Sequence, residues 1–213
     1  MDLRDRLVLV FFTIVVTLLT NIVFKLLQNK FDFMVDTRKF KRDLYYQQLT
    51  NLYIEVYAMI AQSEFLRYFY DLKDNGTLEK IPFIEQASTK HTQKIKLFTG
   101  EILEEKREVI ETALTEFNKL GLVKKIIDNK KYASQKLIKI VVAYRYCHEY
   151  YLKEDIVKFQ SDRFKKEEVR LLHELVTTII KECNEKLKYC KMDYIESEIK
   201  SGQMRSTEFE EKL

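Results

Sequence analysis

The sequence predicts an all-α protein with a single N-terminal transmembrane helix followed by a cytoplasmic bundle of about four to five helices. An uncharged apolar run begins at Leu7, the 213 residues include only one proline and four glycines, and charged residues make up 33% of the chain. Few turn formers and many helix formers favour long helices over a sheet. The expected parts are an extracytoplasmic N-terminus (1–6), the transmembrane helix (7–27), the bundle (28–192) and an acidic, loosely ordered tail (193–213).

The apolar run from Leu7 to Phe24 predicts a membrane anchor, since it contains no charged residue. A helix over residues 7–27 rises about 30 Å, which matches the hydrocarbon core of a bilayer, and Lys25 can snorkel to its surface. A cleaved signal peptide would have a positive start, a shorter apolar core and small residues at a cleavage site. Here the charges of the first six residues cancel and the first alanine is Ala58.

Flanking charges predict the orientation of this anchor, because translocation disfavours Lys and Arg. Two cations, Arg4 and Arg6, precede the anchor and six follow it closely. We therefore expect a single-pass protein of the cell membrane, with its N-terminus outside and its C-terminal domain in the cytoplasm. The odd number of cysteines fits reduced thiols there. The six cations are Lys25, Lys30, Arg38, Lys39, Lys41 and Arg42, and the cysteines are Cys147, Cys183 and Cys190.

Polar residues within the anchor follow a helical spacing. Thr13, Thr17, Thr20 and Asn21 are separated by four, three and one residues, so they share one face. Such stripes favour association of membrane helices through close packing and interhelical hydrogen bonds. We expect an anchor that self-associates. The alternative is that each threonine simply bonds its own backbone.

A basic cluster follows the anchor. Arg38, Lys39, Lys41 and Arg42 would lie just inside the membrane. Each cation near anionic lipid contributes up to about 1 kcal/mol to surface binding. We expect these residues to contact the membrane surface.

Apolar periodicity predicts the helices of the bundle. From about Asp36, apolar residues recur at alternating gaps of four and three between Tyr45 and Tyr70, which is the repeat of a packed helix. The turn formers Asp74-Asn75-Gly76 should end that helix. We expect a second helix over about 100–120, followed by a short helical turn.

Two further helices complete the expected bundle. Ser134 is a suitable N-cap for a helix that reaches Leu152, although the β-branched residues at 138–142 also permit a strand. Spacings of three and four favour the helix there. The last long helix is expected from Phe164 to Cys190, before the acidic tail.

A lysine-rich stretch suggests anion binding. Seven lysines lie between residues 119 and 139, with only Asp128 to oppose them. They could bind a nucleotide, a nucleic acid or lipid phosphate, but lysines without arginine or aromatic neighbours are typical of a solvated corner. We therefore do not expect nucleic acid as a partner. The candidate anion-binding residues are Lys124, Lys125, Lys130 and Lys131.

No catalytic, metal or cofactor motif stands out. His173-Glu174 resembles the start of a zinc-binding helix, but residue 177 is threonine where the second histidine should be. His148 follows Cys147 without a paired ligand spacing, and we expect it to pack among nearby tyrosines. The isolated glycines form no phosphate-binding loop. The sequence predicts no metal, no cofactor and no catalytic residue.

These observations favour a non-enzymatic, membrane-anchored interaction protein, an adaptor or sensor that self-associates. Its expected partners are the lipid bilayer, further copies of the chain and a cytoplasmic protein. One alternative is a membrane-perturbing effector of a toxin or anti-phage type, in which the bundle controls assembly of the anchor. A second alternative is an enzyme whose site is assembled from scattered side chains.

Overall fold

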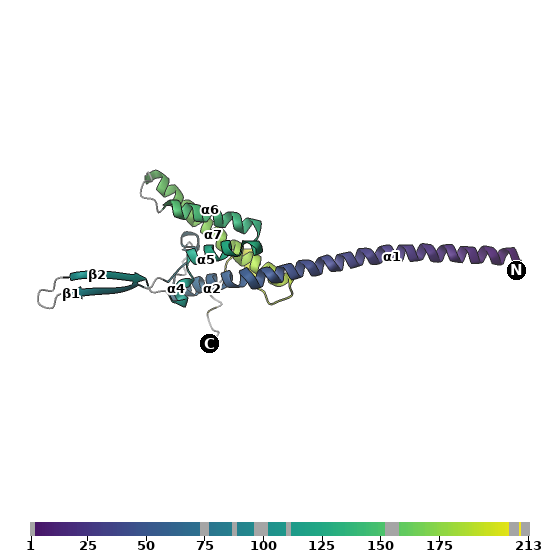
Figure 1. Cartoon of the computed structure of the whole chain (residues 1–213), viewed down its shortest axis with the longest axis horizontal. Coiled ribbons are helices and arrows are strands. Elements are labelled where there is room, and N and C mark those ends of the chain that lie inside the picture. The colour runs from purple at the N-terminus through teal and green to yellow at the C-terminus, as the bar shows by residue number, and fades with distance from the viewer. Residues whose placement is uncertain are drawn as a thin grey trace. The chain divides into compact units, whose positions relative to one another are not determined.

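The computed structural model describes residues 3–72, 77–86, 89–95, 102–109, 112–151, 158–204 and 209. The chain divides into two compact units, Met1–Tyr45 and Tyr46–Leu213. Helices dominate the described residues, as predicted, and a single β-hairpin is the exception among them (Figure 1). The second unit begins at Tyr46, whereas the sequence placed the start of the bundle at residue 28.

The first unit consists of one helix. Helix α1 (Leu3–Gln48) is 46 residues long and therefore rises about 69 Å. Every side chain between Val10 and Leu44 is exposed. This helix is long and apolar enough to span a membrane, as the sequence predicted for residues 7–27.

A π-helical turn follows α1 and precedes α2. The turn η1 (Leu49–Tyr53) leads directly into α2 (Ile54–Phe69). A π-turn disturbs the regular backbone hydrogen bonds, and here the Asn51 side chain donates to the backbone oxygen of Gln47 at 2.7 Å. The apolar residues of the turn are fully buried.

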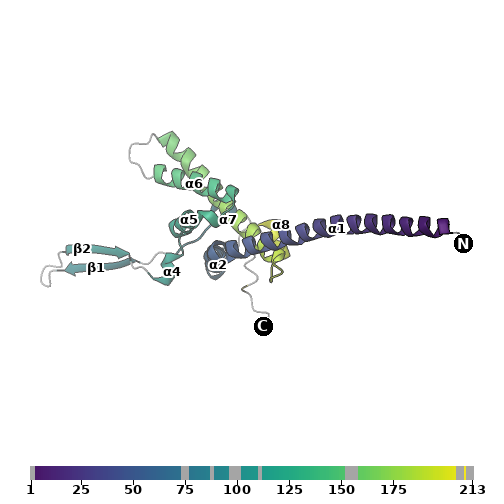
Figure 2. The same ribbon diagram turned by 45° about the vertical axis from the view of Figure 1, so that its right-hand side comes forward.

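The core of the second unit is formed mainly by α2, α5, α6 and α7. Helices α6 (Gln135–Tyr151) and α7 (Lys158–Tyr189) lie side by side (Figure 2), and α5 (Lys119–Asp128) and the 3-10 turn η2 (Lys130–Tyr132) precede them. The helical prediction for residues 138–142 is confirmed. The largest fully buried side chains are Leu49, Leu52, Tyr53, Ile60, Phe83, Leu122, Ile126, Leu137, Tyr144, Leu175, Ile179 and Ile180.

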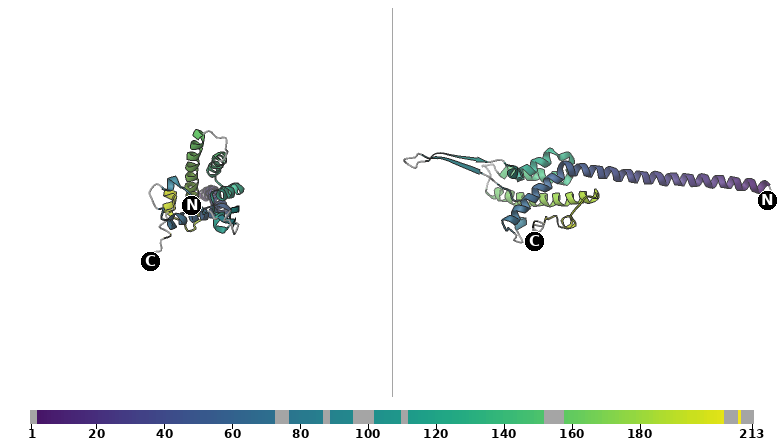
Figure 3. Two further views of the ribbon diagram at one scale, coloured as in Figure 1. Left: turned by 90° about the vertical axis from the view of Figure 1, so that its left-hand side faces the viewer. Right: turned by 90° about the horizontal axis from the view of Figure 1, so that it is seen from below.

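A β-hairpin replaces most of the helix expected at 100–120. Strand β1 (Thr89–Ile95) pairs antiparallel with β2 (Ile102–Val109), and the hairpin extends away from the helices of its unit (Figure 3). The register pairs Lys90 with Glu108 and Lys94 with Glu104. A count of helix formers in a short window does not detect pairing between strands. The prediction of a helix over about 100–120 was therefore wrong over 102–109.

Short helices occupy the remaining connections. Helix α3 (Thr77–Lys80) follows α2, and α4 (Ala113–Glu116) lies between the hairpin and α5. The turn expected at residues 74–76 lies outside the described residues. Gly121, expected to precede a helical turn, lies inside α5, where its missing side chain leaves room for the backbone oxygen of Glu116.

The start of the C-terminal tail is ordered. Helix α8 (Glu196–Ser201) packs on α7, and both Glu198 and Met204 are buried. Gly202 ends α8 with a φ of 69°, a conformation that glycine adopts readily. The prediction of a loosely ordered tail was therefore wrong for this segment, because a few apolar and hydrogen-bonding side chains suffice to attach an acidic sequence.

Candidate functional site

The exposed apolar surface of α1 is the first candidate site. Within it, the Thr17 hydroxyl donates to the backbone oxygen of Thr13 at 2.7 Å, and the Thr20 hydroxyl donates to that of Val16 at 2.8 Å. The hydroxyl groups of Thr17 and Thr20 therefore already donate hydrogen bonds to the backbone of α1. Asn21 makes no side-chain hydrogen bond to the described part of the chain, so it brings unused amide donors to the same face.

The basic cluster after the predicted span is exposed on α1. Arg38 and Lys39 lie in the exposed part of the helix, while Arg42 is 3.9 Å from Asp43 and Lys41 lies over the ring of Tyr45. Such exposed pairs contribute little energy and leave the cations accessible to anions.

The four candidate anion-binding lysines have different surroundings. The Lys125 ammonium is 2.6 Å from a Glu55 carboxylate oxygen, and the Lys131 ammonium lies over the Tyr132 ring. Lys124 and Lys130 are exposed. Two of the four cations, Lys125 and Lys131, therefore already contact side chains of the chain itself.

Sequence reasoning missed a hydrogen-bonded cluster that joins η1 to α6 and α7, which we call the Tyr53 clamp (Tyr53, Ser134, Glu182 and Lys186). The Tyr53 hydroxyl donates to Glu182 and accepts from the backbone NH of Ser134 at 3.1 Å. The Ser134 hydroxyl donates to Glu182 at 2.7 Å and accepts from the backbone NH of Leu137, which confirms Ser134 as the N-cap of α6.

Burial shifts the pKa values of Tyr53 and Lys186 in this clamp. Desolvation raises the pKa of the Tyr53 hydroxyl, and the Glu182 carboxylate beside it raises that pKa further. Burial also lowers the pKa of Lys186, although its ion pair with Glu182 at 3.4 Å opposes that shift. A tyrosine that holds its proton more firmly donates a persistent hydrogen bond, which suits a structural role.

A second tyrosine, Tyr57 in α2, follows Tyr53 by four residues and makes a similar contact. The Tyr57 hydroxyl donates to the buried carboxylate of Glu198 at 2.8 Å, and the Asn184 amide donates to the same oxygen at 2.7 Å. The Asn184 oxygen accepts from the backbone NH of Ile195. These bonds attach α8 to α2 and α7. The only sequence signal was the four-residue spacing of Tyr53 and Tyr57, which indicates a shared helix face.

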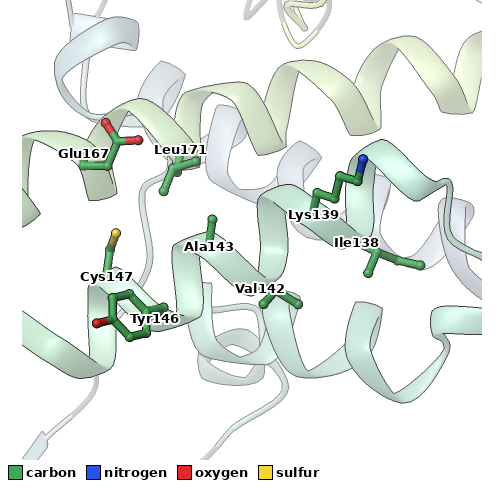
Figure 4. Close-up of a pocket in the computed structure, with 8 residues that line it drawn as sticks. All are labelled: Ile138, Lys139, Val142, Ala143, Tyr146, Cys147, Glu167 and Leu171. Carbon is green, nitrogen blue, oxygen red and sulfur yellow. The ribbon is translucent and has the colours of Figure 1, made fainter.

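An open groove lies between α6 and α7, with a cavity volume of about 570 Å³ (Figure 4). Its lining is mostly apolar, with Lys139 and Glu167 as the charged residues, and Glu167 bonds Arg170 at 2.6 Å. Burial and two nearby carboxylates raise the pKa of the Cys147 thiol, which makes it a poor nucleophile. The groove can hold an apolar group but offers no evident chemistry. It is lined by Ile138, Lys139, Val142, Ala143, Tyr146, Cys147, Glu167 and Leu171.

The histidines and cysteines do not assemble a metal site in the part of the chain that the structure describes, where no three potential ligands cluster. His148 stacks on Tyr144 at 5.9 Å between ring centroids and bonds Glu168 at 2.8 Å, so the expected packing against tyrosine is confirmed. Cys147, Cys183 and Cys190 are not joined by disulfides. Burial raises the pKa of Cys183 to about 12.

The chain was compared with known proteins in three ways. No family model, no curated protein and no solved structure matches it.

Proposed function

We propose that the protein is a non-enzymatic, single-pass membrane protein, an adaptor or sensor that self-associates through α1 and presents its second unit to a cytoplasmic protein. The observation that carries the proposal is the apolar surface of α1. Thirteen large apolar side chains between Val10 and Leu27 are exposed, and they point to all sides of the helix.

The energetics favour a bilayer around this segment. Burying one large apolar side chain is worth about 1.5–3 kcal/mol, so burial of all thirteen favours transfer from water by roughly 20–40 kcal/mol. A helix that is apolar all round needs a core or a membrane, and every side chain of α1 between Val10 and Leu44 is exposed. The helix also satisfies its own backbone groups, as a spanning segment must.

Charge supports the orientation. More cations follow the apolar segment than precede it, which favours an outside N-terminus and a cytoplasmic second unit. The exposed cluster Arg38, Lys39, Lys41 and Arg42 would then lie close to the anionic inner leaflet.

Asn21 supports self-association. An amide with unused donors inside hydrocarbon gains by bonding a partner helix, and interhelical bonds of this kind contribute about 0.5–2 kcal/mol each. The Thr17 and Thr20 hydroxyl protons are used within α1, so these residues contribute close packing. The groove between α6 and α7 is the surface we assign to a protein partner, because exposed apolar patches of this kind mark interaction sites.

Membrane extraction of the full chain tests this proposal. We expect the chain to stay in the membrane pellet at alkaline pH, to dissolve in detergent and to form crosslinked dimers or higher species in membranes. Protease added to the cytoplasmic face should digest the second unit. Release at alkaline pH would refute the anchor, and a strictly monomeric crosslinking pattern would refute self-association.

A membrane-perturbing effector is the second candidate, and Asn21 favours it as well. Assembled anchors would bring several amides together within the bilayer, which could admit water. Growth arrest with dye uptake on induction would support this candidate, and Asn21→Leu should relieve both effects. Unchanged toxicity in that variant would contradict it.

A further inference from the structure

Helix α1 stays apolar beyond the span that crosses the hydrocarbon core. Phe31 and Val35 are 66% and 47% exposed, and Phe33 and Phe40 are 73% and 72% exposed. At about 100° per residue, the first two lie on one face and the last two on the opposite face. A water-exposed helix about 18 residues long with uncovered aromatic groups is only marginally stable alone. We therefore expect one of these two faces of α1 to pack against another apolar surface.

The face that carries Phe31 and Val35 is also the face of the threonines. From Thr17, gaps of three, four, seven and four residues lead to Thr20, Phe24, Phe31 and Val35. These gaps keep the side chains within about 40° of one line along an α-helix. The face with Phe33 and Phe40 lies on the other side of the helix from this line.

A bilayer restricts how a second copy can approach this face. Identical anchors share one orientation and one depth, so their helices run parallel with each residue next to its own counterpart. A continuous face then meets the same face of the partner. Arg38 and Arg42 follow Val35 on this line, and identical cations would oppose each other there. The contact must end before Arg38.

We propose that a second copy of the chain packs in parallel along the α1 face of Thr13, Thr17, Thr20, Phe24, Phe31 and Val35. The contact leaves the hydrocarbon core near Leu27 and continues for eight more residues, about 12 Å, to Val35. This inference rests on the proposed membrane function, and it adds the face and the end point of the contact.

Single-cysteine crosslinking of the full chain in native membranes tests the face. Helices packed about 8–10 Å apart bring facing Cα atoms to about 4–5 Å and leave those of opposite faces about 13–15 Å apart. Only the first distance permits a disulfide. We expect Phe31→Cys and Val35→Cys to give a disulfide-linked dimer under mild oxidation. Phe33→Cys and Phe40→Cys should give no more dimer than the parent chain, which controls for the native cysteines.

Paired serine substitutions give a second measurement. In a chain that carries Thr17→Cys, adding Phe31→Ser and Val35→Ser should reduce the amount of disulfide-linked dimer that forms through residue 17. Phe33→Ser with Phe40→Ser is the matched control, and it should leave that dimer unchanged.

Each other outcome is informative. A dimer at Thr17→Cys without one at Phe31→Cys would overturn the extension to Val35 while leaving the self-associating anchor intact. The assigned face would be overturned if the cysteine variants of Phe31, Val35, Phe33 and Phe40 all gave equal amounts of dimer. It would also be overturned if only Phe33→Cys and Phe40→Cys gave dimer. The absence of any dimer, at Thr17→Cys included, would overturn both this inference and the proposed self-association.

Discussion

The two units use apolar residues in opposite ways. In the first unit, Ile22 is 56% exposed, as are comparable side chains along most of α1. In the second unit, Ile179 is 0% exposed and belongs to a continuous core. Both units are rich in apolar residues, but only the second has several elements to pack against one another.

This contrast shows that apolar content becomes a core only where a second element can cover it. The first unit, a single helix, has no core of its own, whereas the second unit has one. The membrane affinity of the chain should therefore depend on the first unit and its unfolding temperature on the second. The predictions below test that division.

The largest effect is expected from charges in the anchor. Replacing Ile14 and Leu18 with arginine should raise the free energy of membrane insertion by about 6–8 kcal/mol, because an arginine at a span centre costs about 2.5–3.5 kcal/mol and the apolar gain is lost. After alkaline extraction, a larger share of the Ile14→Arg/Leu18→Arg chain than of the parent chain should be in the soluble fraction.

The same charges in the second unit provide the control for that experiment. Val142 and Tyr146 are exposed on α6, so Val142→Arg with Tyr146→Arg should leave the chain in the pellet. Release of this control variant would break the comparison, since it would place membrane affinity in the second unit.

A truncation in the core should give the next largest effect. Ile179→Ala removes buried volume and should lower the free energy of unfolding by about 2–5 kcal/mol. For a unit of this size the unfolding temperature should fall by about 5–15 °C. Ile22→Ala, the same change in the anchor, should leave it unchanged. Circular dichroism of the detergent-solubilised chain measures both, and equal shifts would contradict the division.

Sequence reasoning succeeded where structure depends on local pattern. The apolar run after Leu7 predicted a long helix suited to a membrane, and Ser134 predicted the start of α6. The last long helix, predicted from Phe164 to Cys190, agrees closely with the C-terminal end of α7 at Tyr189. Periodicity and capping are properties of neighbouring residues, so a single sequence contains them.

It failed where structure depends on distant pairing. The hairpin joins Lys90 to Glu108 and the Tyr53 clamp joins Tyr53 to Glu182, and neither separation has a local signature. The α6 and α7 groove likewise arises only when two helices meet. The candidate residues on α1 could thus be chosen from the sequence, whereas the clamp and the groove, which arise from tertiary contacts, could not.

Loss of one clamp hydroxyl should have an intermediate effect. Tyr53→Phe removes one of the donors to Glu182 and leaves the backbone NH of Ser134 without its acceptor, which should lower the free energy of unfolding by about 1–3 kcal/mol. Tyr46→Phe is the matched control, because the Tyr46 side chain is 54% exposed. Urea titration followed by circular dichroism compares them. A neutral Tyr53→Phe would show that the clamp adds nothing to the core.

The smallest effect is expected from a surface ion pair of the second unit. Lys125→Ala removes the contact with Glu55 at 2.6 Å, and because both side chains are partly exposed the cost should be about 0.2–1 kcal/mol. High salt should reduce even that difference, since mobile ions screen exposed charges. Lys124→Ala, an exposed neighbour on the same helix, should cost nothing measurable in the same titrations. If Lys125→Ala cost as much as Ile179→Ala, surface charge would stabilise the second unit as strongly as its core, and apolar burial would no longer explain the contrast with α1.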